Sequence, residues 1–136
     1  VYLDANVFIL SILNIDELGE KARAILKEVQ EGLQKAATSA LTFDEVVWKM
    51  FQLKSFDEAL SAANYLLKMP YLTFLDVNIH TLSKSSELMK KYKLYPRDSI
   101  HAASAVNNNI HIIISEDNDF DAIKELERKS IRDFKI

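Results

Sequence analysis

The segment Ile110–Ile114, with the sequence IHIII, limits the fold of this chain more than any other. It is short, apolar and rich in β-branched residues, which is typical of a strand buried on both faces of a parallel sheet. The polar segment Ser115–Phe120, SEDNDF, follows it directly. Because open α/β sheets place their sites beyond the carboxyl ends of the strands, we expect this polar segment to border a functional site.

Strand-like and helix-like segments alternate along the chain. The strand-like runs lie at Val1–Leu3, Gln34–Thr38, Tyr71–Val77, Ile110–Ile114 and Ile131–Ile136. Helix-like segments separate them, at residues 7–13, 17–31, 42–53, 55–69, 78–92, 96–106 and 121–127. Strands that alternate with helices are typical of parallel sheets, so the pattern predicts a single α/β domain with a mostly parallel sheet.

The composition is that of an ordinary globular domain, with 49% hydrophobic and 27% charged residues among 136. We expect one domain that spans residues 1–136. No apolar run approaches the roughly 20 residues that cross a bilayer, so we expect no membrane association. There is no signal-peptide pattern, and a first residue Val1 indicates a trimmed native start. The absence of cysteine excludes disulfides and thiolate metal sites, and we expect a cytoplasmic location.

Two further features exclude classes of ligand site. The chain has only two glycines, Gly19 and Gly32, so it has no glycine-rich loop for a nucleotide phosphate. Its net charge of -3 argues against a broad basic face for nucleic acid. A nucleic acid held through metal ions stays compatible with that charge.

Five acidic residues lie at expected strand ends or in expected first turns of helices, which a parallel sheet brings to the same edge. Asp4 and Asp117 follow strand-like runs, and Asp119 lies close behind. Asp98 and Glu45 fall in the expected first turns of helices. Carboxylates that share a site repel one another unless a cation lies between them. Oxygen ligands favour Mg²⁺ or Mn²⁺ over zinc, and two such ions about 4 Å apart can activate a water and stabilise a leaving oxygen.

Each acid also has a purely structural explanation. Asp4 can form a turn at a strand end, and Asp117 and Asp119 can cap the next helix. Glu45 follows Thr42 by three residues, which is the spacing of a capping box, and it points away from the apolar stripe of its helix. Asp98 suits a helix start through the macrodipole alone. His101, three residues after Asp98, can line the same cleft or be an ordinary packed or exposed histidine.

Four segments together resemble the PIN domain family, the nucleases that include the VapC toxins. Asp4–Val7 resembles the D-x-N motif that opens the family, and Ser39–Val46 resembles the segment with its glutamate. Arg97–Ala103 is similar to the helix that bears the third acid. Ser115–Phe120 is similar to the closing [ST]-x-D-x-D-F element. The four segments occur in the order that the family has.

This resemblance implies a three-layer α/β/α sandwich whose central, mostly parallel sheet has roughly four to five strands. It implies a Mg²⁺- or Mn²⁺-dependent endoribonuclease. The metal and catalytic residues that it implies are Asp4, Glu45, Asp98 and Asp117, with Asp119 assisting at the metal. Asn6 would orient Asp4 through a hydrogen bond, and Ser115 would orient the closing turn.

The resemblance also implies partners: an RNA substrate, an antitoxin protein that covers the acidic cleft, and a second copy in a homodimer. We expect protein contacts on the apolar faces of the helices at 42–53 and 55–69, including Trp48, Phe51 and Tyr65. A local basic rim for RNA would come from Lys49, Lys54, Lys90, Lys91, Lys93 and Arg97.

Two other interpretations stay open at this point. A phospho-receiver domain would use Asp76 on a middle strand, but it needs a second acid after the first strand and a lysine after the last one. The other interpretation is a PIN-like module that binds RNA or protein without cutting it. The presence of all four acids favours the nuclease.

Overall fold

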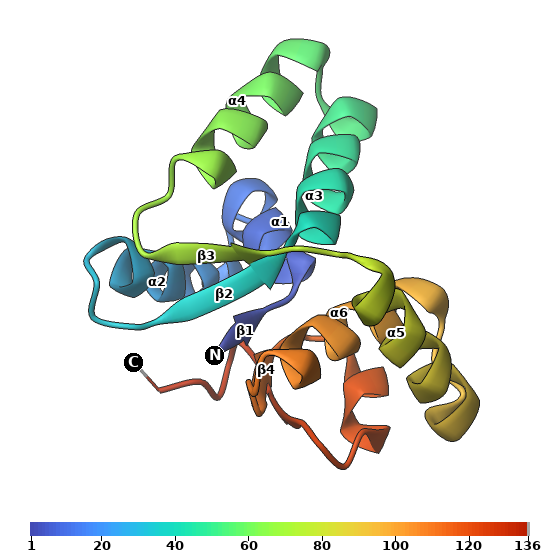
Figure 1. Ribbon diagram of the computed structural model, residues 1–136. Helices are drawn as coiled ribbons and strands as arrows, with labels where there is room; N and C mark the ends of the chain where they lie inside the picture. Colours follow the sequence, from blue (N-terminus) through green and yellow to red (C-terminus); the bar gives the residue numbers. More distant parts are fainter. Residues whose placement is uncertain (136) are drawn as a thin grey trace.

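The protein is described by a computed structural model in which residues 1–135 are placed. A five-stranded sheet runs through the molecule in the order β3-β2-β1-β4-β5, and every pair of neighbouring strands is parallel (Figure 1). The strands are β1 (Tyr2–Leu3), β2 (Ala36–Ser39), β3 (Leu72–Leu75), β4 (Ile112–Ile114) and β5 (Glu127–Lys129). The helices are α1 (Ala5–Leu13), α2 (Glu17–Gln30), α3 (Ala40–Leu53), α4 (Phe56–Leu67), α5 (Ile79–Tyr92), α6 (Pro96–Asn107) and the 3₁₀ helix η1 (Asn118–Ala122).

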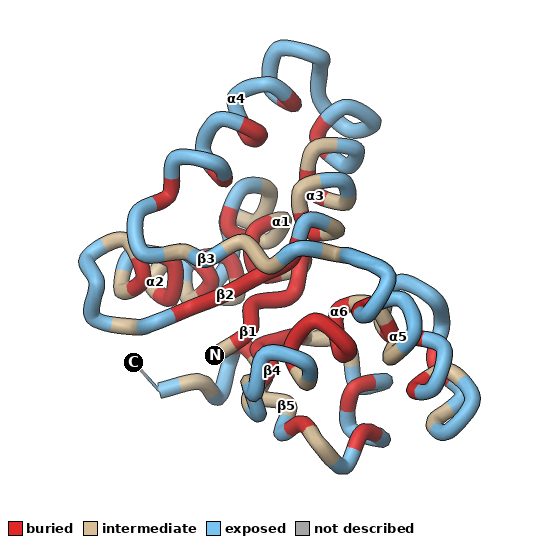
Figure 2. The backbone as a smooth tube through the Cα atoms, in the orientation of Figure 1, coloured by how far each residue is buried: buried red, intermediate tan, exposed pale blue. Residues whose placement is uncertain are grey.

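Two hydrophobic clusters lie on opposite faces of the sheet. Successive side chains of a strand point to opposite faces, so Leu3 and Ile114 pack with α1 to α4, while Tyr2 and Ile113 pack with α5, α6 and η1. The innermost strands are the most buried part of the backbone, whereas the outer turns of α4 and α5 face solvent (Figure 2). The architecture is the predicted three-layer α/β/α sandwich.

The register of the central strands brings the two acidic turns together. Leu3 pairs with Ile114, and the Asp4 amide donates a hydrogen bond to the Ile114 carbonyl at 3.1 Å. Asp4 and Ser115 therefore stand side by side at one edge of the sheet. The helices α3 and α6 begin at the same edge. Helix α3 directly follows β2, and α6 leads back to the start of β4, as the connections of a parallel sheet require.

The end of the chain differs from the prediction. The helix expected at 121–127 is the earlier 3₁₀ helix η1, and the last strand is β5, not the segment expected at Ile131–Ile136. Residues 131–133 form a turn whose Ile131 packs into the core, and residue 136 lies outside the described residues. The strand was missed because its sequence, ERK, is charged. Charged residues are common on edge strands, whose pairing comes from the backbone.

Among residues 1–135, no helix has both the length and the apolar character of a membrane span.

Candidate metal centre

Asp4 is fixed by four hydrogen bonds at the end of β1. It caps α1, because its Oδ1 accepts a hydrogen bond from the Ala5 amide at 2.8 Å. Its Oδ2 accepts from the Ser115 hydroxyl at 2.6 Å and from the Asn6 side-chain amide at 3.0 Å. The same Asn6 amide reaches Ser115 Oγ at 3.0 Å, and the Ile114 carbonyl anchors the backbone. Asn6 thus contacts Asp4, as the resemblance implied, and Ser115 contacts Asp4 in addition to the closing turn, where it was expected. The part of both residues in a reaction stays a prediction.

Glu45 and His101 lie beside Asp4 on its other side. The His101 ring is 1% exposed, and its Nε2 lies 2.8 Å from Glu45 Oε1 and 3.5 Å from Asp4 Oδ1. The opposite ring nitrogen, Nδ1, lies 2.6 Å from the Tyr2 hydroxyl. Asp4, Glu45 and His101, called the inner group below, offer three ligand atoms that lie within 4.8 Å of one another.

The capping-box explanation of Glu45 is wrong. Helix α3 begins at Ala40, so its N-cap is Ser39 and Glu45 lies beyond the first turn. The hydroxyl of Thr42 instead pairs with that of Thr38 at 2.6 Å. Glu45 is 22% exposed at its side chain and faces His101, not open solvent.

Asp98, Asp117 and Asp119 form a second set of carboxylates, called the outer group below, with one oxygen from each within 4.8 Å of the others. Asp98 stands in the first turn of α6. Asp117 caps η1 by accepting a hydrogen bond from the Asp119 amide at 2.9 Å, as the structural explanation expected. The Asp117 amide in turn donates to Ser115 Oγ at 3.0 Å, so one hydroxyl joins the outer group to Asp4.

The pKa shifts show where negative charge lacks a partner. Burial, together with the charges of Asp117, Asp4 and Asp119, raises the pKa of Asp98 from 3.8 to about 6. Burial also raises the pKa of Asp4, although His101 and the Ser115 hydroxyl oppose the shift. Burial lowers the pKa of His101, but the hydrogen bond that His101 donates to Glu45 and the charges of the nearby carboxylates outweigh it, so the pKa lies above its usual value. The inner group therefore contains its own counter-charge, and the outer group does not.

The donor set fits a hard divalent cation. Every member except His101 offers carboxylate oxygen, which Mg²⁺ and Mn²⁺ prefer. The side-chain Oδ1 of Asn6, whose amide nitrogen donates to Asp4, is buried and has no hydrogen-bond partner in the described part of the chain. An orphaned acceptor of this kind calls for a donor or an ion nearby. An ion at this edge of the sheet would offset the repulsion among the gathered carboxylates.

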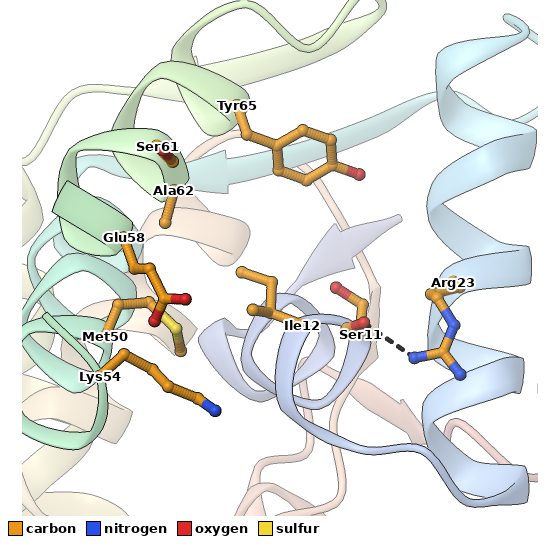
Figure 3. A pocket seen from close by; sticks show the side chains of 9 residues that line it. All are labelled: Ser11, Ile12, Arg23, Met50, Lys54, Glu58, Ser61, Ala62 and Tyr65. Atoms are coloured by element: carbon orange, nitrogen blue, oxygen red, sulfur yellow. Dashed lines mark hydrogen bonds between the residues drawn. The ribbon is translucent and has the colours of Figure 1, made fainter.

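The predicted basic rim is only partly assembled. Lys49 and Arg97 line, with Glu45, a hollow of about 380 Å³ beside the inner group. Lys54 instead lines a larger pocket of about 450 Å³ between α1, α2, α3 and α4 (Figure 3). In that pocket the Arg23 guanidinium donates to the Ser11 carbonyl at 2.9 Å, and Tyr65 closes one end.

Tyr2 is the site residue that sequence reasoning missed, and His101 is the one whose role it left undecided. His101 follows Asp98 by one helical turn, a spacing that places both side chains on the same face of α6. Tyr2 precedes Asp4 by two residues, and its side chain packs in the same layer as α6, where its hydroxyl contacts His101. Only the packing of β1 against α6 brings these two side chains together.

The fold and the acidic edge define a class of protein: a parallel α/β/α sandwich with a centre suited to divalent ions. The model of the PIN domain matches residues 1–126, so the chain belongs to the PIN domain family. The phospho-receiver interpretation is therefore wrong.

Several solved structures have the same fold. VapBC2 from Rickettsia felis, bound to a DNA fragment from its promoter, has a TM-score of 0.75 at 16% identity, over 95% of this chain and 96% of the other. FitAcB from Neisseria gonorrhoeae has a TM-score of 0.74 at 17% identity, over 98% and 99%. VapC20 from Mycobacterium tuberculosis, described as a Sarcin-Ricin loop cleaving toxin, has a TM-score of 0.72 at 15% identity, over 89% and 92%. A search of curated proteins finds no match.

Proposed function

We propose that this PIN domain is a Mg²⁺- or Mn²⁺-dependent endoribonuclease that hydrolyses RNA phosphodiester bonds, and that it is the toxin of a VapBC-type pair. The observation that carries the proposal is the convergence of Asp98, Asp117 and Asp119, beside Asp4, with an Asp98 pKa of about 6. Such a shift is typical of functional sites. The cleaving activity in the description of VapC20 supports the same reading.

The acids that would hold the ion are Asp4, Glu45, Asp98 and Asp117, with Asp119 assisting. A bound divalent ion supplies an activated water at neutral pH and stabilises charge on the leaving oxygen. The protein's own part is to keep these carboxylates in place. Ser115 does so for both sides of the site, because its hydroxyl contacts Asp4 and the Asp117 amide.

The RNA backbone would approach over Lys49 and Arg97. Both side chains line the hollow beside Glu45, so their positive charge lies where a phosphate would enter. The net charge of -3 makes such local contacts more important than a general basic surface.

An antitoxin and a second copy of the chain are the proposed protein partners. Trp48 and Phe51 are 53% and 48% exposed and stack with ring centroids 5.7 Å apart, and Phe56 meets Phe51 edge to face. Tyr65 is 40% exposed beside the pocket of Figure 3. Exposed aromatic residues that lie together on a surface are typical of interfaces, and the neighbouring VapBC structures are complexes.

RNA cleavage tests the proposal. Wild type should cut RNA with Mg²⁺ or Mn²⁺ and stop when EDTA is added. Asp98→Asn should lose the activity, because it removes a ligand charge but little packing, and Asp57→Asn should keep it. Asp57 is an exposed acid of α4 and makes the matched control for loss of one charge. Cleavage that persists in EDTA, or full activity of Asp98→Asn, would contradict the proposal.

A further inference from the structure

The His101 ring lies where a second cation would be expected. Its Nε2 lies 2.8 Å from Glu45 Oε1 and 3.5 Å from Asp4 Oδ1, so it bridges the two acids of the inner group. The ring is 1% exposed and packs edge to face on Tyr2, with centroids 5.7 Å apart. Its position is therefore set by the core as well as by its polar partners.

The hydrogen bond between His101 and Glu45 has the same direction in both protonation states of the ring. An ionised carboxylate only accepts, so Nε2 must carry the hydrogen that Glu45 receives. In the neutral ring Nδ1 accepts a hydrogen bond from the Tyr2 hydroxyl, and in the charged ring it donates one to the same oxygen. A buried chain from Tyr2 through His101 to Glu45 results, and each member orients the next one.

The outer group lacks such a partner. Within residues 1–135, no lysine, arginine or histidine forms an ion pair with Asp98, Asp117 or Asp119. Arg128, on the neighbouring strand β5, binds Asp121 and the Ser115 carbonyl. Two sets of acids at one edge of the sheet therefore differ in whether the protein already supplies a donor between them.

We propose that His101 is a positioning residue whose Nε2–H group takes the place of a second divalent cation between Asp4 and Glu45. The site then holds one ion, bound by the outer group with help from Asp4, and Glu45 is held by His101 and not by the ion. This inference rests on the proposed metal site and changes it at one residue, because Glu45, which the proposed function counts among the ligands, would bind His101 in place of the ion.

The test is the number of Mn²⁺ ions that the protein binds, measured by calorimetry on wild type, His101→Gln and His101→Ala. Wild type should bind one ion. The side-chain amide of glutamine can present an N–H close to the place of Nε2, so His101→Gln should also bind one. His101→Ala removes the donor and opens space between two carboxylates, so a second ion should bind. Two ions in wild type, none in wild type, or one ion in a folded His101→Ala variant would overturn the proposal.

A second measurement decides the matter if His101→Ala does not fold. In ¹⁵N-labelled wild type, the His101 Nε2 signal should have the shift of a protonated nitrogen before and after addition of Mg²⁺. Loss of that proton, or a shift typical of a metal-bound nitrogen, would overturn the positioning role.

The proposed function and this inference can fail separately. If wild type binds one ion but does not cleave RNA, the inference about His101 is supported and the proposed nuclease function is contradicted. Cleavage that depends on two bound ions would sustain the function and remove the inference.

Discussion

The two groups of acids at the carboxyl edge of the sheet differ in how the repulsion among their carboxylates is compensated. In the inner group Asp4 and His101 are buried and Glu45 is partly buried, and an imidazole N–H lies between the two carboxylates. The outer group is partly open to solvent and leaves Asp98 with a pKa of about 6. The inner group can be stable without an ion, whereas the outer group gains most from one. The inner group is thus the structural part of the site, and the adjacent outer group is the part that responds to an ion.

The largest expected effect is a difference in Mn²⁺ affinity between a variant of the outer group and a variant of the inner group. Asp117→Asn should lower Mn²⁺ affinity by about 100-fold, since losing one member of a close charge pair costs roughly 2 to 3 kcal/mol. Glu45→Gln should lower it by about fivefold or less, because only a longer-range attraction of roughly 1 kcal/mol is lost. Calorimetry measures both, and equal losses in the two variants would erase the division between the groups.

Removing the hydroxyl that joins the two groups should have the next largest effect. Ser115→Ala loses the contacts to Asp4, Asn6 and the Asp117 amide, so Mn²⁺ affinity should fall by about 10- to 100-fold. Ser83→Ala, on the exposed face of α5, is the matched control. An unchanged affinity in Ser115→Ala would show that the carboxylates do not depend on this hydroxyl.

Ion binding should also depend on pH because of Asp98. Its pKa of about 6 means that it is protonated below that pH and must lose the proton to bind an ion. Mn²⁺ affinity should therefore be level above about pH 7 and fall by about tenfold towards pH 5. A flat profile over this range would place the ion away from Asp98.

The smallest effect concerns stability without metal. The pKa of Asp98 is raised on folding from 3.8 to about 6, so the folded state keeps a proton that the unfolded state loses, and stability falls as pH rises through this interval. Asp98→Asn should be more stable than wild type at about pH 7, because asparagine carries no charge that the folded state disfavours. The gain should be only on the order of 1 kcal/mol, because water screens the half-exposed group. The gain should vanish near pH 4. Denaturant unfolding in EDTA measures it, and a less stable variant at pH 7 would contradict the raised pKa.

Much of this site could be predicted from strand ends alone. The apolar strand before Ser115 and the short first strand before Asp4 are enough to place both at one edge, because parallel strands share their carboxyl ends. Asp98 followed from the proline that starts its helix, which fixes the first turn.

The missed features depend on tertiary packing. The partners of His101 lie 56 and 99 residues away, and no local pattern indicates them. The position of Glu45 was misjudged because α3 begins at Ala40, before the apparent capping signal of Thr42. The strand β5 has no hydrophobic pattern, since its place at the sheet edge leaves only the backbone to specify it.

The central claim is that segments far apart in the chain build one ion site. Paramagnetic broadening tests it directly: a small amount of Mn²⁺ is added to ¹⁵N-labelled wild type, and the loss of each backbone amide signal is followed. We predict that the amides of Asp4, Asp98, Asp117 and Asp119 disappear first and together, while that of Asp57 on α4 persists. Broadening that begins elsewhere, or that reaches only one of these segments, would contradict the account.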